Sequence, residues 1–150
     1  MTTMFLQQIG TTVRPMEPDD YDSLMQIENA AFESPLSDDD MIRHLCCMTI
    51  EVLVVQRMSA TLGYIMYSER PDHLFINRIA VSYPLCGFGG TLIADVKRRC
   101  VTSGRLYVDA FVDERDLTAQ KFFSRIGFKA IDIVRGDGDK YLFRHIRGGR

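Results

Sequence analysis

Three glycines, Gly87, Gly89 and Gly90, lie between an apolar segment that favours a strand and a segment with helical spacing. The first N–H groups of a helix have no partner inside the helix, and the helix dipole is positive at that end. Glycine has no Cβ atom, so its backbone can approach a phosphate closely. The spacing therefore predicts a site for a phosphate or diphosphate group near residues 85–91.

Two known phosphate-binding motifs and one simpler explanation compete for this turn. A P-loop requires a Lys-Ser/Thr pair after its last glycine, and this sequence has none there. A dinucleotide-binding fold places its glycines near the start of the chain, with an acidic residue about 20 positions later. Asp109 meets the second condition, but the turn lies past the middle of the chain. A tight strand–helix connection that binds nothing would use the same glycines, so this alternative stays open from the residues alone.

The elements that would hold this turn follow from periodicity and turn residues. Strands are predicted at residues 12–16, 51–56, 61–67, 74–81, 105–112, 128–134 and 140–146. Helices are predicted to begin at Pro18, at Ser37, after the glycine turn and at Leu117. The order β-α-α-β-β-β-α-β-α-β-β predicts a mixed α/β domain built on one sheet. The three middle strands should be antiparallel, and the unit 74–112 should be a right-handed parallel crossover.

Length, charge and cysteine usage narrow the class of protein. The 150 residues predict a single domain, with residues 1–11 as a loose lead-in and 147–150 as a flexible tail. A net charge of −2 and a pI of about 5.9 argue against nucleic acid as a partner. The four cysteines have no C-x-x-C or zinc spacing, which favours a reduced, cytoplasmic setting. The sequence predicts neither a signal peptide nor a membrane span.

The order of elements, with the glycine turn after the fourth strand, resembles the GNAT acyl-CoA N-acyltransferases over residues 12–146. Two further segments strengthen the resemblance. The segment I-E…F-x-x-P-L-S at 27–37 resembles I-E…F-x-x-P-W-S of the RimI-type protein N-terminal acetyltransferases. The segment D-x-x-A-x-x-F-F-x-x-x-G-F at 116–128 resembles their N-x-x-A-x-x-L-Y-x-x-x-G-F. The three motifs stand in the family's order and spacing.

The resemblance implies a mostly antiparallel sheet with a splayed central parallel pair, and an N-acetyltransferase that uses acetyl-CoA and no metal. It implies a protein N-terminal amine as acceptor, with a small amine or a lysine as the alternative. A module that binds acyl-CoA or a protein partner without turnover is a third possibility, and a homodimer stays open. The implied cofactor contacts are Ile79, Ala80 and Val81 for the pantetheine, Cys86, Gly87, Phe88, Gly89, Gly90 and Thr91 for the pyrophosphate, and Asp116 and Phe123 nearby.

Four positions depart from the family's pattern. Pro84 replaces the Gln or Arg that usually begins the loop, and Asp116 replaces an Asn. Phe123 stands where a Tyr usually protonates the departing thiolate, and Phe111 stands where the RimI group has its glutamate base. Both of the family's best-known catalytic side chains are therefore phenylalanine here. Thiolate is a fair leaving group, so we expect slower transfer rather than none.

Asp109 is the remaining candidate for a base. Alternation along the strand places Tyr107, Asp109 and Phe111 on one face of the sheet. We expect Asp109 to relay the proton of the amine, directly or through water. The alternative is a buried carboxylate paired with Arg78 on the neighbouring strand.

Three residues are predicted to meet the acceptor. Glu28 and Leu36 lie where the family binds it, and Tyr141 belongs to the last hairpin. For Glu28 the alternative is a solvated glutamate on a helix surface. For Tyr141 the alternative is simple packing.

Overall fold

The computed structural model describes residues 10–148. Residues 1–9, which are most of the predicted lead-in, and residues 149–150 of the predicted tail lie outside the described part. The strands are β1 (Thr11–Pro15), β2 (Ile50–Arg57), β3 (Ala60–Glu69), β4 (His73–Val81), β5 (Tyr107–Asp113), β6 (Lys129–Val134) and β7 (Lys140–Ile146). The helices are η1 (Pro18–Asp20), α2 (Tyr21–Ala31), α3 (Asp38–Leu45), α4 (Phe88–Thr102) and α5 (Leu117–Arg125). Thr11, predicted within the lead-in, is the first residue of β1.

The strands form one sheet in the order β1-β2-β3-β4-β5-β7-β6. Neighbouring strands are antiparallel except β4 and β5, which are parallel and joined through α4. The predicted fold class, with three antiparallel middle strands and a parallel crossover, is confirmed. β1 is an edge strand, which suits Pro15 because proline has no N–H to donate to a second neighbour.

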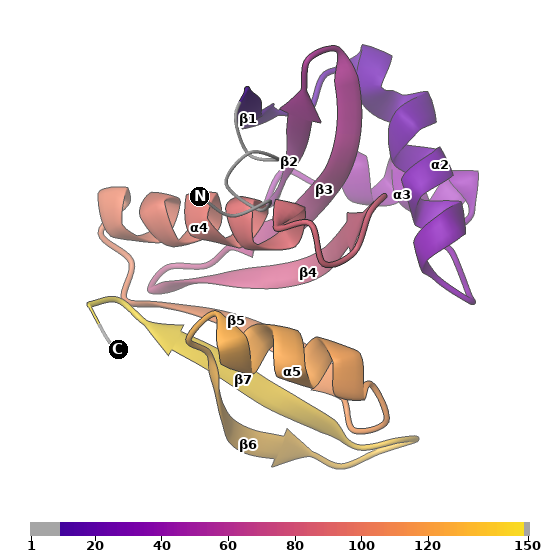
Figure 1. Ribbon diagram of the computed structural model, residues 1–150. Coiled ribbons are helices and arrows are strands. Elements are labelled where there is room, and N and C mark those ends of the chain that lie inside the picture. The colour runs from indigo at the N-terminus through magenta and orange to yellow at the C-terminus, as the bar shows by residue number, and fades with distance from the viewer. Residues whose placement is uncertain (1–9, 149–150) are drawn as a thin grey trace.

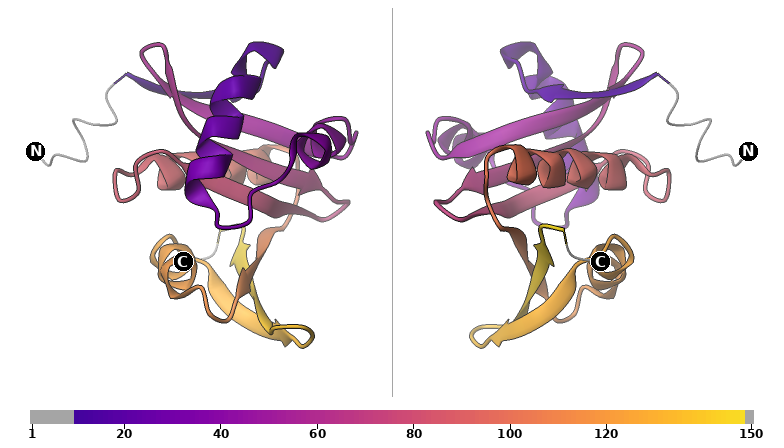
Figure 2. Two further views of the ribbon diagram at one scale, coloured as in Figure 1. Left: turned by 90° about the vertical axis from the view of Figure 1, so that its right-hand side faces the viewer. Right: turned by 90° about the vertical axis from the view of Figure 1, so that its left-hand side faces the viewer.

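Helices cover the two faces of the sheet unevenly. Figures 1 and 2 show α2 on one face of β2–β4 and α4 on the opposite face, while α5 lies beside β5–β7. A core cluster between α4, α5 and the sheet includes Leu53, Leu92, Val108 and Phe143. A second cluster, under α2 and α3, draws its strand residues from β2–β4 alone. We call the side that bears α2 and α3 the α2 face, and the other side the α4 face.

Short polar and glycine signals set the helix ends, as the sequence predicts. The Ser37 hydroxyl accepts a hydrogen bond from the Asp40 amide at 3.2 Å and caps α3. Gly104 follows α4 with a φ of 74°, a left-handed conformation that glycine adopts without strain. Ser37 therefore fixes where α3 begins, and Gly104 fixes where the chain leaves α4 and turns toward β5.

The parallel pair β4–β5 is hydrogen-bonded over only part of its length. The ladder runs from His73 opposite Tyr107 to Ile76 opposite Ala110 and then stops. At the same point the β3–β4 register shifts, because Met66 faces Arg78 and Tyr67 faces Ile76, which leaves Asn77 as an extra residue. Such a bulge bends and twists the strand that carries it. Beyond it, residues 78–81 of β4 pair with β3 alone, and a gap opens in the sheet.

Candidate functional site

The first turn of α4 presents backbone N–H groups without protein partners. Among the described residues, the amides of Gly87, Phe88, Gly89 and Gly90 have no hydrogen-bond acceptor. Thr91 is the first residue of the turn whose amide is satisfied, at 3.0 Å from the Gly87 carbonyl oxygen. Helix α4 spans 15 residues, and its first turn contains no acidic side chain that would neutralise the dipole. This end of the helix can therefore accept an anion.

Each of the three glycines of the turn is explained by a different physical feature. Gly87 has a φ of 86°, which favours glycine. A Cβ atom on Gly89 would lie 3.1 Å from the ring of Phe122, so this glycine lets α5 pack closely on α4. A Cβ atom on Gly90 would meet nothing within 4 Å. The packing of the protein therefore does not require glycine at position 90. A ligand that contacts the backbone there would require it, because a side chain would block its approach.

The other residues of the predicted loop differ in backbone conformation, burial and hydrogen bonding. Leu85 has a φ of 65°, so left-handed residues occur at positions 85 and 87 of this loop. Cys86 is half-buried and packs against the core on the α4 face. The Thr91 hydroxyl donates to the Gly87 carbonyl at 2.9 Å. The Thr91 amide belongs to the helix ladder, and its contact with the pyrophosphate stays a prediction.

Figure 1 shows α4 and α5 beginning on the same side of the molecule, where β4 and β5 diverge. Ile79 and Val81 lie on β4 beyond the ladder and pack toward the α4 face, whereas Ala80 belongs to the cluster on the α2 face. On the α2 face beside the gap, the rings of Phe75 and Phe111 meet edge to face at 5.3 Å. Phe111 is 45% exposed. The structure thus brings the predicted β4 contacts and the glycine turn to one gap.

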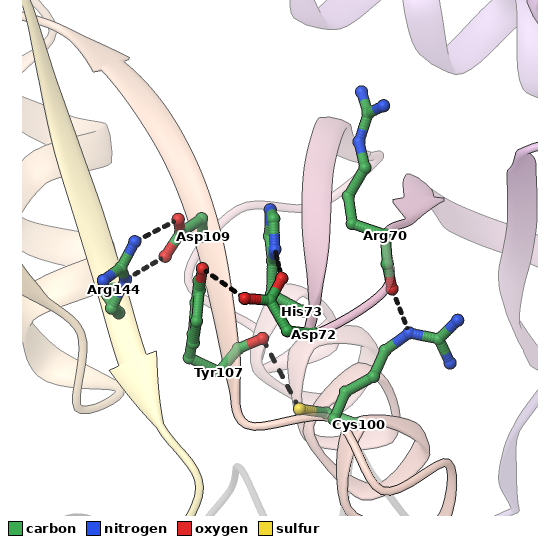
Figure 3. Close-up of polar contacts among 8 residues, drawn as sticks. Arg70, Asp72, His73, Cys100, Tyr107, Asp109 and Arg144 are labelled. Atoms are coloured by element: carbon green, nitrogen blue, oxygen red, sulfur yellow. Dashed lines mark hydrogen bonds and ion pairs between the residues drawn. The ribbon is translucent and has the colours of Figure 1, made fainter.

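Asp109 is buried, and its charge is already paired. Its two carboxylate oxygens accept hydrogen bonds from Nε and Nη2 of Arg144 at 2.7 and 2.9 Å (Figure 3). Its exposed fraction is 5%. The geometry favours an ion pair over the proton-relay role, which stays a prediction. The expected partner Arg78 is wrong, because Arg144 comes from β7, the other neighbour of β5.

A chain of polar and aromatic contacts continues from this pair toward the start of β4. The guanidinium carbon of Arg144 lies 3.8 Å from the ring centre of Tyr107. Tyr107 stacks on His73 at 4.7 Å, and its hydroxyl is 3.5 Å from Asp72 (Figure 3). A hydrogen bond from His73 lowers the pKa of Asp72. These contacts link the Asp109–Arg144 pair, through the Tyr107 ring, to the start of β4.

Glu28 is not the solvated glutamate that the helix pattern allowed. Its side chain is fully buried and contacts three other elements. It accepts hydrogen bonds from the Leu36 amide at 2.7 Å and from Nε of Arg78 at 2.8 Å. The Tyr64 hydroxyl and a second Arg78 nitrogen donate to it as well. Because all of these groups belong to the protein, the prediction that Glu28 contacts an acceptor directly loses its geometric basis.

The remaining predicted residues separate into two places. Leu36 is half-buried in the loop between α2 and α3, next to the α2 face cluster. Tyr141 packs on the opposite face, in a groove with α5, so the packing alternative applies to it. Phe123 is a core residue on that face, 5.1 Å from the ring of Phe128. Asp116 is exposed, and its carboxylate caps α5 by accepting from the Ala119 amide at 3.0 Å.

Sequence reasoning missed the network that Glu28 forms with Tyr64 and Arg78. One signal was present, because Glu28 follows Leu24 by four residues and therefore lies on the apolar stripe of α2. A charged residue on a buried stripe requires a partner. The partners stand 36 and 50 residues later in the chain. No local pattern identifies them.

Two further observations concern groups that could hold metals or cross membranes. Among residues 10–148, no group of three or more His, Cys, Asp or Glu side chains is placed to hold a metal ion. All four cysteines are free thiols, with Cys46 and Cys47 exposed and Cys100 buried. No helix in this part of the chain is long and apolar enough to cross a membrane.

Comparison with solved structures identifies the fold. The ribosomal-protein-S18-alanine N-acetyltransferase of Escherichia coli superposes with a TM-score of 0.81 and 18% identity, over 91% of this chain and 94% of that one. Ard1 of Thermoplasma volcanium gives 0.79 and 18%, over 91% and 97%. Arabidopsis thaliana NAA60 in complex with acetyl-CoA gives 0.77 and 18%, over 93% and 99%. No protein-family model and no curated protein matches the chain. The chain therefore has the GNAT acetyltransferase fold.

Proposed function

We propose that this protein is an N-acetyltransferase that moves an acetyl group from acetyl-CoA to a primary amine. One observation carries the proposal. The four amides at the start of α4 lack acceptors among the described residues, and they lie where β4 and β5 separate. Solved structures with the same fold support it, since Arabidopsis NAA60 is in complex with acetyl-CoA. A relative from Thermoplasma acidophilum is described as an N-acetyltransferase in complex with coenzyme A.

The residues of the turn fit a diphosphate. The amides of Gly87–Gly90 would donate to its oxygens, and the positive end of the α4 dipole would favour its charge. The open space at Gly90 would let the backbone approach it. The edge of β4 at residues 79–81, which pairs with β3 alone, would receive the pantetheine arm. Thr91, Asp116 and Phe123 stay predicted neighbours of the cofactor, although the Thr91 amide and the Asp116 carboxylate are bonded within the protein and Phe123 lies in the core.

The main contribution of the protein to the reaction would be to align the two reactants. Acetyl-CoA supplies an acyl group activated as a thioester. The chain would hold it in the gap while an amine approaches from the α2 face, so that both reactants meet at close range. The Phe75 and Phe111 rings, which meet on that side, would give the approaching amine an apolar surface. As a proton relay, Asp109 would act directly or through water with the remaining lone pairs of its carboxylate, since each oxygen accepts one hydrogen bond from Arg144.

The acceptor we propose is a protein N-terminal amine. The support is the structural likeness to the Escherichia coli enzyme, whose description names an alanine of a ribosomal protein. A small amine or a lysine is the alternative acceptor. An α-amine has a pKa of about 7.8 and a lysine about 10.4, so near neutral pH a much larger share of α-amines is uncharged and able to attack. We further propose a single domain, a cytoplasmic setting and no nucleic-acid partner.

A second candidate function is a binding module that holds acyl-CoA without turnover. Phe111 and Phe123 favour it, because neither ring can exchange a proton. Release of free CoA thiol with a pool of peptides separates the two candidates. Thiol release that depends on a peptide supports the enzyme, whereas tight binding of acetyl-CoA with no release supports the module.

The substitution Gly90→Ala tests the cradle. Its Cβ would project into open space, so the fold should keep its stability or gain about 0.5–1 kcal/mol from the helix propensity of alanine. Affinity for acetyl-CoA should fall at least about tenfold, or 1.4 kcal/mol, because the methyl group blocks close approach. Isothermal titration calorimetry and thermal unfolding measure the two effects.

Gly104→Ala is the matched control. It places alanine at a φ of 74° at the far end of α4, which should cost about 1 kcal/mol of stability while the affinity stays unchanged. Full affinity in Gly90→Ala would place the ligand elsewhere. An absence of binding by the unaltered protein would overturn the proposed function.

A further inference from the structure

Glu28 joins four parts of the chain at one buried point. It belongs to α2 and bonds Tyr64 on β3, Arg78 on β4 and the amide of Leu36 in the loop between α2 and α3. No part of its side chain is exposed, whereas 22% of the Arg78 side chain is. A buried carboxylate is tolerated when its oxygens are saturated with donors, as they are here.

The network holds its charges firmly. Burial acts to raise the pKa of Glu28, but hydrogen bonds from Arg78, Tyr64 and the Leu36 amide outweigh it, and the net pKa is lowered. The pKa of Arg78 is raised, although burial opposes the shift, because it faces this carboxylate. The pKa of Tyr64 is raised by burial and by its bond to Glu28, so the hydroxyl stays a donor. The pair is ionised, and Glu28 has no proton to give and no free oxygen to receive one.

The same network fixes the loop that follows α2. Phe32, the first residue after the helix, lies under the guanidinium of Arg78, whose central carbon is 3.8 Å from the ring centre. Leu36 is held through its amide by Glu28 itself. Both ends of the segment 32–36 are therefore tied to β4 through one ion pair.

The place where this segment is tied bears on function. Arg78 directly follows the bulge at Asn77, and it lies beyond the last residue pair of the β4–β5 ladder. The segment thus borders the gap on the α2 face. Helix α4, which begins at the proposed anion-binding turn, lies on the opposite face of the sheet (Figure 2). A second reactant would then reach the gap from the side that this segment borders.

We propose that Glu28 is a positioning residue that holds the segment 32–36 as one wall of the acceptor entrance, without touching the acceptor. This inference rests on the proposed function. It replaces a direct contact with an indirect one, transmitted through Arg78 and the Leu36 amide. It therefore predicts that loss of the Glu28 charge affects the acceptor and leaves acetyl-CoA binding intact.

The test compares Glu28→Gln with Asp20→Asn. Asp20 is a suitable control because it is also buried, with Nη1 and Nη2 of Arg14 at 2.7 and 2.8 Å and the Glu17 amide at 2.8 Å, but it lies beside β1 at the sheet edge. At a temperature where both variants are folded, KM for the peptide that supports thiol release should rise about tenfold in Glu28→Gln, equivalent to 1.4 kcal/mol. KM for acetyl-CoA should change less than about twofold, and Asp20→Asn should alter neither constant.

Two further measurements keep the proposal falsifiable. Hydrogen exchange of the Leu36 amide should accelerate in Glu28→Gln, which reports the loop without any turnover. Arg78→Lys keeps the charge but loses the two-pronged contact, so it should raise the acceptor KM as well, to a smaller extent. Faster exchange with an unchanged acceptor KM would overturn the positioning role, as would an equal rise in both KM values. If the unaltered protein binds no acetyl-CoA, it is the proposed function that fails.

Discussion

Three buried carboxylates on residues Asp20, Glu28 and Asp109 each accept two hydrogen bonds from one arginine. Their partners are 6, 50 and 35 residues away along the chain. Alternation along a strand indicates that Asp109 faces the same side as Phe111, but it does not say which neighbouring strand supplies the arginine. That is why the sequence pointed to Arg78 on β4 and the structure has Arg144 on β7. The identity of a partner across a sheet depends on strand order, which is a property of the fold.

Asp109→Asn separates the two roles that the sequence left open. Asparagine keeps the shape but loses the charge that holds Arg144, so unfolding free energy should fall by roughly 1.5–3 kcal/mol. If the ion pair is the whole role, kcat at full folding should change less than about threefold, and the pH profile should keep its shape. Urea unfolding and initial-rate assays measure both quantities. A loss of kcat far beyond the loss of folded protein would restore Asp109 as the proton relay.

The sequence predicted those parts of the candidate site that depend on neighbouring residues in the chain. It did not predict the parts that depend on contacts between distant elements. Gly87, Gly89 and Gly90 indicated a turn that can bind an anion, because glycines before a helix leave its first backbone N–H groups accessible to a ligand. The sequence could not assign Gly89 to packing against Phe122, since that contact joins α4 to α5. Nor could it tell that Tyr141 faces α5, because the last hairpin could place either of its faces toward the acceptor side.

At the level of elements, the bulge at Asn77 is the feature that shapes the gap. It interrupts the β3–β4 register at the same position where the β4–β5 ladder ends. The Asn77 side chain accepts a hydrogen bond from the Ser68 hydroxyl at 2.8 Å, which holds the extra residue in place. A regular β4 would continue alongside β5 and leave less room between them.

Deletion of Asn77 tests this account. Without the extra residue the alternation of β4 becomes regular, and Arg78, Ile79 and Ala80 keep their present faces. The protein should fold, with a change in unfolding free energy of about 1–3 kcal/mol, while acetyl-CoA affinity falls by more than about tenfold. Titration calorimetry and circular dichroism measure the outcome. A deletion variant that binds acetyl-CoA normally would show that the bulge does not open the gap.

Most element boundaries were predictable because their signals are local. The Ser37 cap and Gly104 both occur where the sequence placed them. Strands were found within a few residues of their predicted positions, and β1 begins one residue early, at Thr11. The bulge was not predictable, since an extra residue in a strand is visible only against the register of its neighbour. The separation of β4 from β5 was predicted from the resemblance to a family and not from the periodicity of the sequence.

At the scale of the whole molecule, the buried acids make stability depend on pH. Hydrogen bonds from Arg14 lower the pKa of Asp20, and those from Arg78, Tyr64 and Leu36 lower the pKa of Glu28 against the effect of burial. Lowered folded-state values mean that the unfolded chain takes up protons first as the pH falls. Their contribution is therefore complete above the ordinary carboxyl pKa of about 4 and is lost as the pH falls below it.

Unfolding free energy should accordingly stay nearly constant from about pH 7 to 5, apart from a small decline below about 6.5 because burial and Lys97 lower the pKa of His145. Below about pH 4.5 it should fall steeply. Urea unfolding at several pH values measures this curve. In Glu28→Gln the steep part should be shallower, because one titrating group is gone. Equal acid slopes in the variant and the unaltered protein would contradict the lowered Glu28 pKa.

The hydrophobic core bridges the gap on one face only. The cluster that contains α4 also contains Val108, Ala110 and Phe143 from beyond the gap, whereas the cluster under α2 contains no residue of β5–β7. The buried core therefore joins the two halves of the sheet on the α4 face, and a hinge motion between them would have its axis on that side. Rotation of the two halves about this axis would widen or narrow the gap on the α2 face. The same motion would then control the entry of an amine.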